Sequence, residues 1–215
     1  MQPVAKALLG GLLLLMLPLA GCTAAPVKES VNDAETLVEI EDPCMLATQS
    51  SLQSLVSIQV DGKDRFFRLS VPSSTPGTKL PIVLAFHGGG DAEEDFPQQN
   101  QFDQLGETEK FIMVYVIADS DRTAAEGDWY LNSAATSRED NDFSEQIVDD
   151  LAQVFCIDED RLYATGYSLG SMFTYEIACQ LNQRFAAVAS FAGTMPVSPE
   201  SVSYTHLTLP TNIGV

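Results

Sequence analysis

The pentapeptide Gly166-Tyr167-Ser168-Leu169-Gly170 limits the possible folds of this chain more than any other stretch, and it lies between an apolar run and a helical pattern. The run from Arg161 to Thr165 predicts a short strand. After the pentapeptide, apolar residues recur at helical spacing, and these are Phe173, Ile177, Ala178 and Leu181. The two glycines supply the small residues that a strained strand-to-helix turn needs. We therefore expect Ser168 at the tip of a tight turn, with its hydroxyl above the end of a sheet.

Ser168 is a candidate nucleophile. A hydroxyl is a poor nucleophile until a base removes its proton, so the motif implies a histidine that is oriented by a carboxylate. Where this turn is found, both partners follow the serine along the chain. After Ser168 the sequence holds no aspartate, two glutamates (Glu176 and Glu200) and one histidine, His206, close to the last residue. No acidic partner precedes His206 suitably, so we expect the general base and the acid of this site to be missing from the chain.

A second element fits the same chemistry upstream. Pro81 to Phe86 form a continuous apolar run that stops at His87-Gly88-Gly89-Gly90, which predicts a buried strand ending in a flexible loop. Glycines let backbone N–H groups approach an oxyanion, so we expect Gly88 or Gly89 to donate one hydrogen bond and Leu169 N–H the other. The alternative for the loop is an ordinary glycine-rich turn. His87 either acts as the general base or shapes this loop, and its place before the nucleophile favours the second role.

The remaining pattern predicts an α/β fold. Leu55 to Val60 and Arg65 to Val71 alternate in polarity, and Asp61-Gly62 between them is a strong signal for a two-residue hairpin turn. A helix is predicted to open at Asp142, and its apolar face comprises Phe143, Ile147, Val148, Leu151, Val154 and Phe155. Apolar strands separated by amphipathic helices indicate a mostly parallel, doubly wound sheet. We expect it to be preceded by the antiparallel hairpin and to be incomplete at the C-terminus.

The acidic balance of the chain excludes some partners. Its 215 residues include 30 acidic and 11 basic side chains, which gives a formal charge of −19. A nucleic acid or an anionic phosphate substrate would be repelled, so a neutral small-molecule or polymeric substrate is favoured. No motif implies a cofactor or a metal, and we expect a monomer.

The N-terminus predicts export and lipidation. Lys6 precedes an apolar run, Ala7 to Leu19, that is short for a membrane span, and Leu19-Ala20-Gly21-Cys22 matches the bacterial lipobox. We expect residues 1–21 to be a signal peptide and lipidated Cys22 to anchor the protein stably to a bacterial membrane. Thr23, and not aspartate, follows the cysteine, which by resemblance to Gram-negative sorting signals favours the outer membrane in such a host. The alternatives are an uncleaved anchor helix and an extracellular protein.

The next segments predict a tether and a catalytic domain. Residues 22–50 carry Ala, Pro, Glu, Asp and Ser with weak periodicity, which is typical of an acidic, solvated tether. Residues 51–200 are expected to form a partial catalytic domain. Residues 201–215 look like a translated sequencing adapter, so we expect this tail to be non-native.

With these motifs in place, the chain resembles the secreted α/β-hydrolase esterases, which group feruloyl and acetylxylan esterases with polyhydroxybutyrate depolymerase-like proteins. The likeness is carried by Asp64 to Pro72, Pro81 to Gly90, Phe111 to Val116, Trp129, Asp142-Phe143 and, most specifically, Cys156 to Cys179. The resemblance implies Ser168 as the nucleophile, with the oxyanion donors named above. Two positions depart from the family pattern: Ser171, where glycine is usual, and Val116-Ile117-Ala118, where a Pro-Asp pair is usual.

The cysteines predict one disulfide. Exported proteins lie in oxidising compartments, in which disulfides persist. Cys179 lies about 16 Å down the helix that follows Ser168, and Cys156 lies just before the strand that climbs a similar distance to the turn. We therefore predict a Cys156–Cys179 disulfide, with two buried thiols as the alternative. Cys44 would be left over, which hints at a partner cysteine in missing sequence.

Together these features predict an extracytoplasmic, lipid-anchored serine esterase. Trp129 and Tyr130 either line an acyl pocket or pack in the core. The family resemblance implies hydroxycinnamoyl or acetyl esters of polysaccharide, or else polyhydroxyalkanoate, as substrate, and a peptidase activity is a weaker option. The alternative is an inactive fragment or a non-catalytic surface lipoprotein, and a fragment would leave an edge strand near Phe185 to Phe191 unpaired.

Overall fold

The computed structural model describes residues 42–90, 95–119, 129–131 and 137–194. All of them belong to one compact unit, Ile40–Val215. The strands are β1 (Ser51–Val60), β2 (Lys63–Val71), β3 (Leu80–Phe86), β4 (Ile112–Val116), β5 (Ile157–Tyr167) and β6 (Ala187–Phe191). The helices are the 3-10 turn η1 (Pro43–Met45), α1 (Asp95–Gln98), α2 (Phe102–Glu109), α3 (Glu139–Val154) and α4 (Leu169–Gln180).

The strands form one mixed sheet in the order β1-β2-β4-β3-β5-β6. The pairs β1–β2 and β2–β4 are antiparallel, whereas β3 runs parallel to both β4 and β5, and β5 runs parallel to β6. The predicted α/β class, with an N-terminal hairpin before a mostly parallel sheet, is confirmed. Among the described strands, β6 forms one edge of the sheet.

The hairpin turn lies where the sequence predicts it. Asp61 and Gly62 separate β1 from β2, with φ of 50° and 79°. Two central residues with positive φ are typical of the turn whose twist matches that of paired strands. Val60 and Lys63 are consequently paired across the turn.

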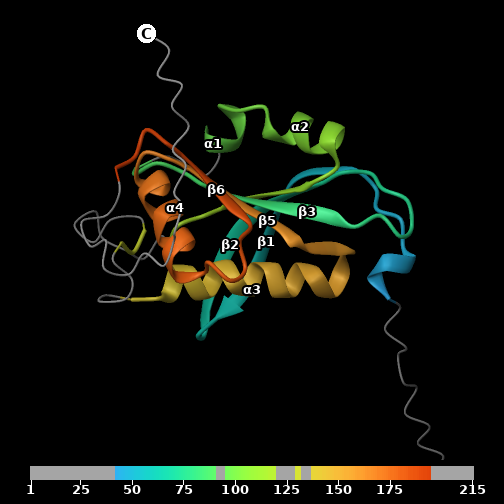
Figure 1. The fold of residues 1–215 in the computed structure, drawn as a ribbon, viewed down its shortest axis with the longest axis horizontal. Coiled ribbons are helices and arrows are strands. Elements are labelled where there is room, and N and C mark those ends of the chain that lie inside the picture. The colour runs from blue at the N-terminus through green and yellow to red at the C-terminus, as the bar shows by residue number, and fades with distance from the viewer. Residues whose placement is uncertain (1–41, 91–94, 120–128, 132–136, 195–215) are drawn as a thin grey trace, which may run out of the picture. The chain divides into compact units, whose positions relative to one another are not determined.

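Helices lie on both faces of the sheet (Figure 1), with α1 and α2 on one side and α3 and α4 on the other. Successive residues of a strand point to opposite faces of the sheet. On the α3 and α4 side, Ile82, Leu84 and Phe86 of β3 join one buried cluster with the apolar faces of both helices. On the α1 and α2 side, the smaller cluster comprises Ala85, Phe96, Met113 and Tyr115.

Helix α3 differs from its prediction at both ends. It begins at Glu139, three residues before Asp142, and Arg138 at its N-terminus makes no side-chain capping hydrogen bond. Most of the predicted apolar face is buried, but Val154 is 59% exposed. Val154 is the last residue of the helix, where the chain turns toward β5 and no neighbouring element covers the side chain.

The predicted Cys156–Cys179 disulfide is wrong. The bond joins Cys44 to Cys156, with their Cα atoms 4.4 Å apart, and Cys179 is free. The chain that leads into β3 and the first residue of β3 hold both bonded residues, because Gly77 N–H donates to Cys44 O at 2.7 Å and Leu80 N–H donates to Cys156 O at 2.8 Å.

Cys179 is on the wrong side of α4 to reach Cys156. The helix turns Phe173, Ile177 and Leu181 into the core. Cys179 follows Ile177 by two residues, which is about 200° around a helix of 3.6 residues per turn. Burial, and secondarily the Glu176 carboxylate, raise the pKa of the Cys179 thiol. This half-buried thiol therefore stays protonated at neutral pH.

Candidate active site

Ser168 occupies a strained turn between β5 and α4. Its φ of 51° and ψ of −114° are unusual for a residue with a side chain. Strand β5 ends at Tyr167, and α4 begins at Leu169. The predicted tight turn is confirmed, and such strain at a polar residue is typical of a functional site.

The two glycines of the pentapeptide are required by close backbone contacts. A Cβ on Gly166 would lie 2.6 Å from Thr174 Oγ1, and one on Gly170 would lie 2.5 Å from the carbonyl carbon of Phe86. Both distances are far inside van der Waals contact. Glycine at these positions lets α4 return directly over β5 and lets its first turn lie against the end of β3.

The turn is also held from the side of β6. Ser168 N–H donates to Phe191 O at 3.0 Å, and a Cβ on Gly193 would lie 2.9 Å from Ser168 O and 2.5 Å from Ser171 Oγ. Ser171 is fully buried, so the serine that stands where the family usually has glycine packs against the chain after β6. The backbone around Ser168 is thus fixed by strands on either side of β5.

The glycine loop lies next to this turn. Phe86, the last residue of β3, pairs with Gly166 of β5. His87 and Ser168 therefore follow the ends of two neighbouring strands. Gly88 is buried, whereas Gly89 and Gly90 are exposed. The two predicted elements are therefore brought together, as the order of the motifs implied.

His87 is engaged through both ring nitrogens. Ala118 N–H donates to Nε2 at 3.2 Å, so Nε2 must be the unprotonated nitrogen. Nδ1 lies 2.8 Å from Gly88 O, a carbonyl that can only accept, so Nδ1 carries the proton. His87 is 5% exposed. This neutral ring holds the loop together and presents no free lone pair to Ser168, which supports the loop-shaping role over that of a general base.

Leu169 supplies a donor by its place in α4. It is the first residue of the helix, and the first N–H groups of a helix have no intrahelical partner. They also carry the positive end of the helix dipole, which favours negative charge. The predicted donor role of Leu169 N–H is thus compatible with the geometry.

Trp129 lies in the core. It is 2% exposed, and its ring stacks on that of Phe173, with 5.3 Å between the ring centres and an 18° angle between the rings. The ring of Phe86 packs nearly perpendicular to the indole. Its indole N–H donates to His87 O at 3.0 Å. Of the two interpretations of Trp129, packing is therefore supported and an acyl-pocket lining is not.

Sequence reasoning missed the ion pair that anchors the segment around Trp129. Arg65 Nη2 donates to Asp140 Oδ1 at 2.9 Å, and Tyr130 N–H donates to Asp140 Oδ2 at 2.8 Å. Arg65 and Asp140 are 3% and 1% exposed. The only signal in the sequence was a charged residue at an inward-facing position of the alternating run that begins at Arg65.

A cavity of about 290 Å³ lies beside the turn. Its lining comprises Phe96, Gln99, Asn100, Phe102, Thr165, Gly166, Tyr167 and Phe191. Tyr167 and Phe191 pair across β5 and β6 and stack at 5.9 Å. The volume is close to the lower end of ligand pockets, roughly 300–1,000 Å³. The cavity therefore suits a small, partly aromatic group.

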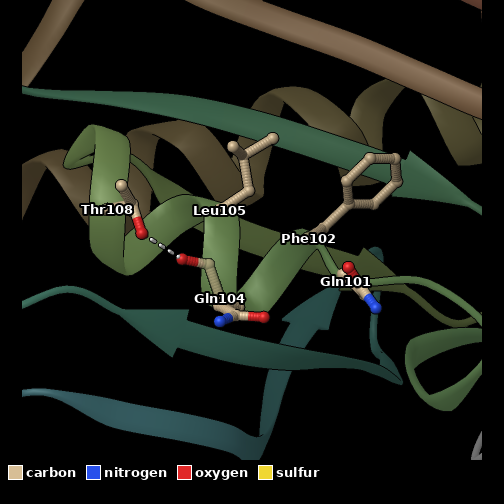
Figure 2. A pocket seen from close by; sticks show the side chains of 5 residues that line it. All are labelled: Gln101, Phe102, Gln104, Leu105 and Thr108. Atoms are coloured by element: carbon tan, nitrogen blue, oxygen red, sulfur yellow. Dashed lines mark hydrogen bonds between the residues drawn. The ribbon is translucent and has the colours of Figure 1, made fainter.

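A second hollow, of about 350 Å³, lies over the outer side of α2. Figure 2 shows its five lining residues, Gln101, Phe102, Gln104, Leu105 and Thr108, with the Thr108 hydroxyl donating to Gln104 O at 2.9 Å. No residue of the turn or of the glycine loop lines it. We therefore assign it no part in the chemistry of Ser168.

Within the described ranges, no cluster of three or more His, Cys, Asp or Glu residues could hold a metal ion. The same residues include no helix that is long and apolar enough to cross a membrane. Cys22, the proposed lipidation site, and His206 lie outside the described residues.

Comparison with known proteins agrees with this geometry. A family model described as "Putative esterase" matches residues 59–206. "Putative esterase NocK" of Nocardia uniformis subsp. tsuyamanensis is 28% identical over 83% of this chain and 51% of its own length. The "Bifunctional acetylxylan esterase/xylanase XynS20E" of Neocallimastix patriciarum is 28% identical over 61% of this chain and 18% of its own.

A solved structure, the acetyl xylan esterase from Aspergillus awamori, superposes with a TM-score of 0.56 at 21% identity. The superposition covers 69% of this chain and 56% of that one, and it shows a shared fold. The chain spans about half the length of the first relative and a smaller part of the second.

Proposed function

This chain belongs to the esterase family and has the α/β-hydrolase fold. We propose that it comes from a serine esterase that hydrolyses carboxylic esters through an acyl-enzyme. The observation that carries the proposal is the position of Ser168. Its strained turn follows β5 directly beside the loop that follows β3. The nucleophile and the backbone N–H donors therefore lie together at the C-terminal ends of these two parallel strands.

The reaction follows from that arrangement. Ser168 Oγ attacks the ester carbonyl carbon while a base takes its proton, and the carbonyl oxygen becomes an oxyanion. The N–H groups of Leu169 and of the glycine loop stabilise that charge. The C–O bond to the alcohol breaks, the base returns the proton to the alcohol, and water then releases the acid and regenerates Ser168. Neither a metal nor a cofactor takes part in these steps.

A residue other than His87 supplies the general base. His87 is the only histidine among the described residues. Its Nε2 accepts from Ala118 and its Nδ1 donates to Gly88, so it is committed to the loop. This commitment also favours the alternative proposal, that the chain by itself is an inactive fragment or a non-catalytic surface lipoprotein.

The substrate class is proposed from the cavity beside the turn. Phe96, Phe102, Tyr167 and Phe191 give it an aromatic lining, which supports a hydroxycinnamoyl ester of polysaccharide. Acetyl esters and polyhydroxyalkanoate are the competing classes that the family resemblance implies. Methyl ferulate, p-nitrophenyl acetate and a 3-hydroxybutyrate oligomer separate the three.

The test uses the parent reading frame, sequenced and expressed beyond codon 200. We expect an in-frame aspartate and then a histidine, ester turnover, and a fluorophosphonate adduct on Ser168 by mass spectrometry. Ser168→Ala removes turnover and adduct, while Ser57→Ala, on the exposed part of the distant strand β1, keeps both. A parent frame that stops after Val215, or turnover that survives Ser168→Ala, rejects the catalytic proposal.

Export and anchoring are proposed from the lipobox alone. Cys22 is expected to carry the lipid, with a tether after it and the catalytic domain outside the cytoplasm. The predicted tether, residues 22–50, is too long at its C-terminal end, because η1 begins at Pro43 and Cys44 is bonded to Cys156 of the domain. Labelling a bacterial host with a fatty-acid analogue should mark the protein, and Cys22→Ser should abolish both the label and membrane fractionation. Equal membrane fractionation of the two forms would favour an uncleaved anchor helix.

A further inference from the structure

We infer that Trp129 and His87 are positioning residues that set the two peptide planes of the glycine loop and thereby aim the Gly89 N–H at the oxyanion. The inference rests on the proposed function and adds to it which glycine donates and what holds that donor in place. Glycine residues have little conformational preference of their own, so a loop of three glycines needs outside contacts to hold one conformation.

The first peptide plane is set by Trp129. The carbonyl of His87 and the N–H of Gly88 belong to one planar trans peptide, so they point in opposite directions. That carbonyl accepts from the indole N–H at 3.0 Å and lies against Gly170 of α4. The Gly88 N–H is therefore turned away from the first turn of α4, which argues against Gly88 as the oxyanion donor.

The second peptide plane is set by His87. Its Nδ1–H donates to Gly88 O at 2.8 Å, and the ring is tied through Nε2 to Ala118, just beyond the end of β4. In the sheet, β3 lies between β4 and β5. Since the ring, and with it the Gly88 carbonyl, is drawn to the β4 side, the Gly89 N–H of the same peptide points to the β5 side, where Ser168 lies.

Trp129 is itself anchored, so its hydrogen bond is a stable reference for the loop. Its ring stacks on Phe173 and packs nearly perpendicular to the ring of Phe86, and the next residue donates its N–H to Asp140 Oδ2. Asp140 is in turn paired with Arg65 in the interior. Contacts from β3 and α4 thus hold the indole that orients the His87 carbonyl, and α3 holds the residue that follows it.

The test separates orientation from packing. Trp129→Phe keeps an aromatic ring in the stack and removes the N–H, whereas Phe173→Leu loosens the same stack and keeps the hydrogen bond. In the completed enzyme we expect Trp129→Phe to lower kcat about tenfold or more with little change in KM, since a lost oxyanion donor costs roughly 10²–10³ in kcat. Phe173→Leu should lower the melting temperature at least as much while largely retaining kcat.

A second readout does not depend on catalysis. In the ¹⁵N-labelled chain, Trp129→Phe should shift or broaden the Gly88 and Gly89 amide resonances, and Phe173→Leu should leave them near their wild-type positions. His87→Asn retains a donor near the Nδ1 position. Its Gly89 amide resonance should therefore lie closer to the wild-type position than that of His87→Leu.

The outcomes are distinguishable. Amides that respond equally to Trp129→Phe and Phe173→Leu, or a Trp129→Phe enzyme with wild-type kcat, would overturn the positioning role. Amide shifts as expected in a parent protein without Ser168-dependent turnover would keep the role of Trp129 and His87 in the loop conformation, but would overturn the oxyanion assignment together with the proposed function.

Discussion

Arg65 of β2 and Asp140 of α3 form an ion pair across the protein interior, with 2.9 Å between Arg65 Nη2 and Asp140 Oδ1. The guanidinium also lies 4.3 Å from the centre of the Phe143 ring. The neighbouring pair Lys63–Glu139 joins the same two elements at 3.3 Å, but its side chains are 53% and 36% exposed. One structure thus offers a buried and an exposed ion pair between the same strand and helix.

Asp140→Asn should be strongly destabilising, because it leaves the Arg65 charge buried without a counter-charge. Breaking a buried pair in this way costs about 3–5 kcal/mol of unfolding free energy. Glu139→Gln is the matched control, because solvent screens an exposed pair and its contribution to stability is small. Urea denaturation of both variants measures the difference. Equal losses would show that Arg65 finds another partner or water when Asp140 is changed.

Gly170→Ala should disrupt the contact between α4 and the end of β3. The new methyl group would lie 2.5 Å from the Phe86 carbonyl carbon, so either α4 or the end of β3 would have to shift. We expect a loss of at least about 3 kcal/mol, at the upper end of overpacking effects. Gly62→Asn is the control, because nothing lies within 4 Å of a Cβ there and asparagine tolerates positive φ. Chemical denaturation of both variants tests this, and a Gly170→Ala protein of wild-type stability would contradict the contact.

The Cys44–Cys156 bond should be recovered by peptide mapping without reduction, as one cross-linked pair of peptides. It closes a loop across 112 residues. In the chain-entropy model, closing a loop of that order stabilises by about 4–5 kcal/mol, so Cys44→Ser should lower the unfolding free energy markedly. Cys179→Ser should leave the cross-linked pair intact. Recovery of a Cys156–Cys179 pair would contradict the structure.

Glu107 should make stability depend on acidity. The Lys110 ammonium, and then the hydroxyl and N–H of Ser73, lower the pKa of this carboxyl to about 2. A lowered pKa in the folded state stabilises it above the ordinary carboxyl pKa of about 4.3. That stabilisation is lost as the pH falls toward 2.

Melting temperatures from pH 6 to pH 2 give the test. The difference between wild type and Glu107→Gln should be largest above pH 5 and should shrink toward pH 2. Glu109→Gln, an exposed change in the same sequence region, is the control. A difference that stays constant across the range would show that the carboxylate is not the source of the effect.

Local patterns predicted much of the fold and of the site. The alternation around Asp61-Gly62 predicted the hairpin, and the apolar run before His87 predicted β3 almost to the residue. The pentapeptide predicted the strained turn at Ser168, because only a few residue types can occupy such a backbone. Helix α3 was predicted on its apolar face but not at its ends, where Val154 is exposed and the start precedes Asp142.

The remaining features depend on contacts between distant segments. Spacing along two elements made Cys179 a plausible partner for Cys156, but the rotation of α4 turned it away and the segment before β3 brought Cys44 in instead. No periodicity relates Arg65 to Asp140, which are 75 residues apart. The order of the strands, once formed, decides which charges and sulfurs meet.

The local elements and the turn that presents Ser168 can be predicted from the amino-acid sequence alone. The steric limits on glycine and serine backbones and the periods of strands and helices act over a few residues. The disulfide, the buried ion pair and the hydrogen bonds of the His87 ring depend on tertiary contacts. Each of these depends on groups that the sheet order brings together: Cys44 with Cys156, Arg65 with Asp140, and His87 with Ala118 and Gly88.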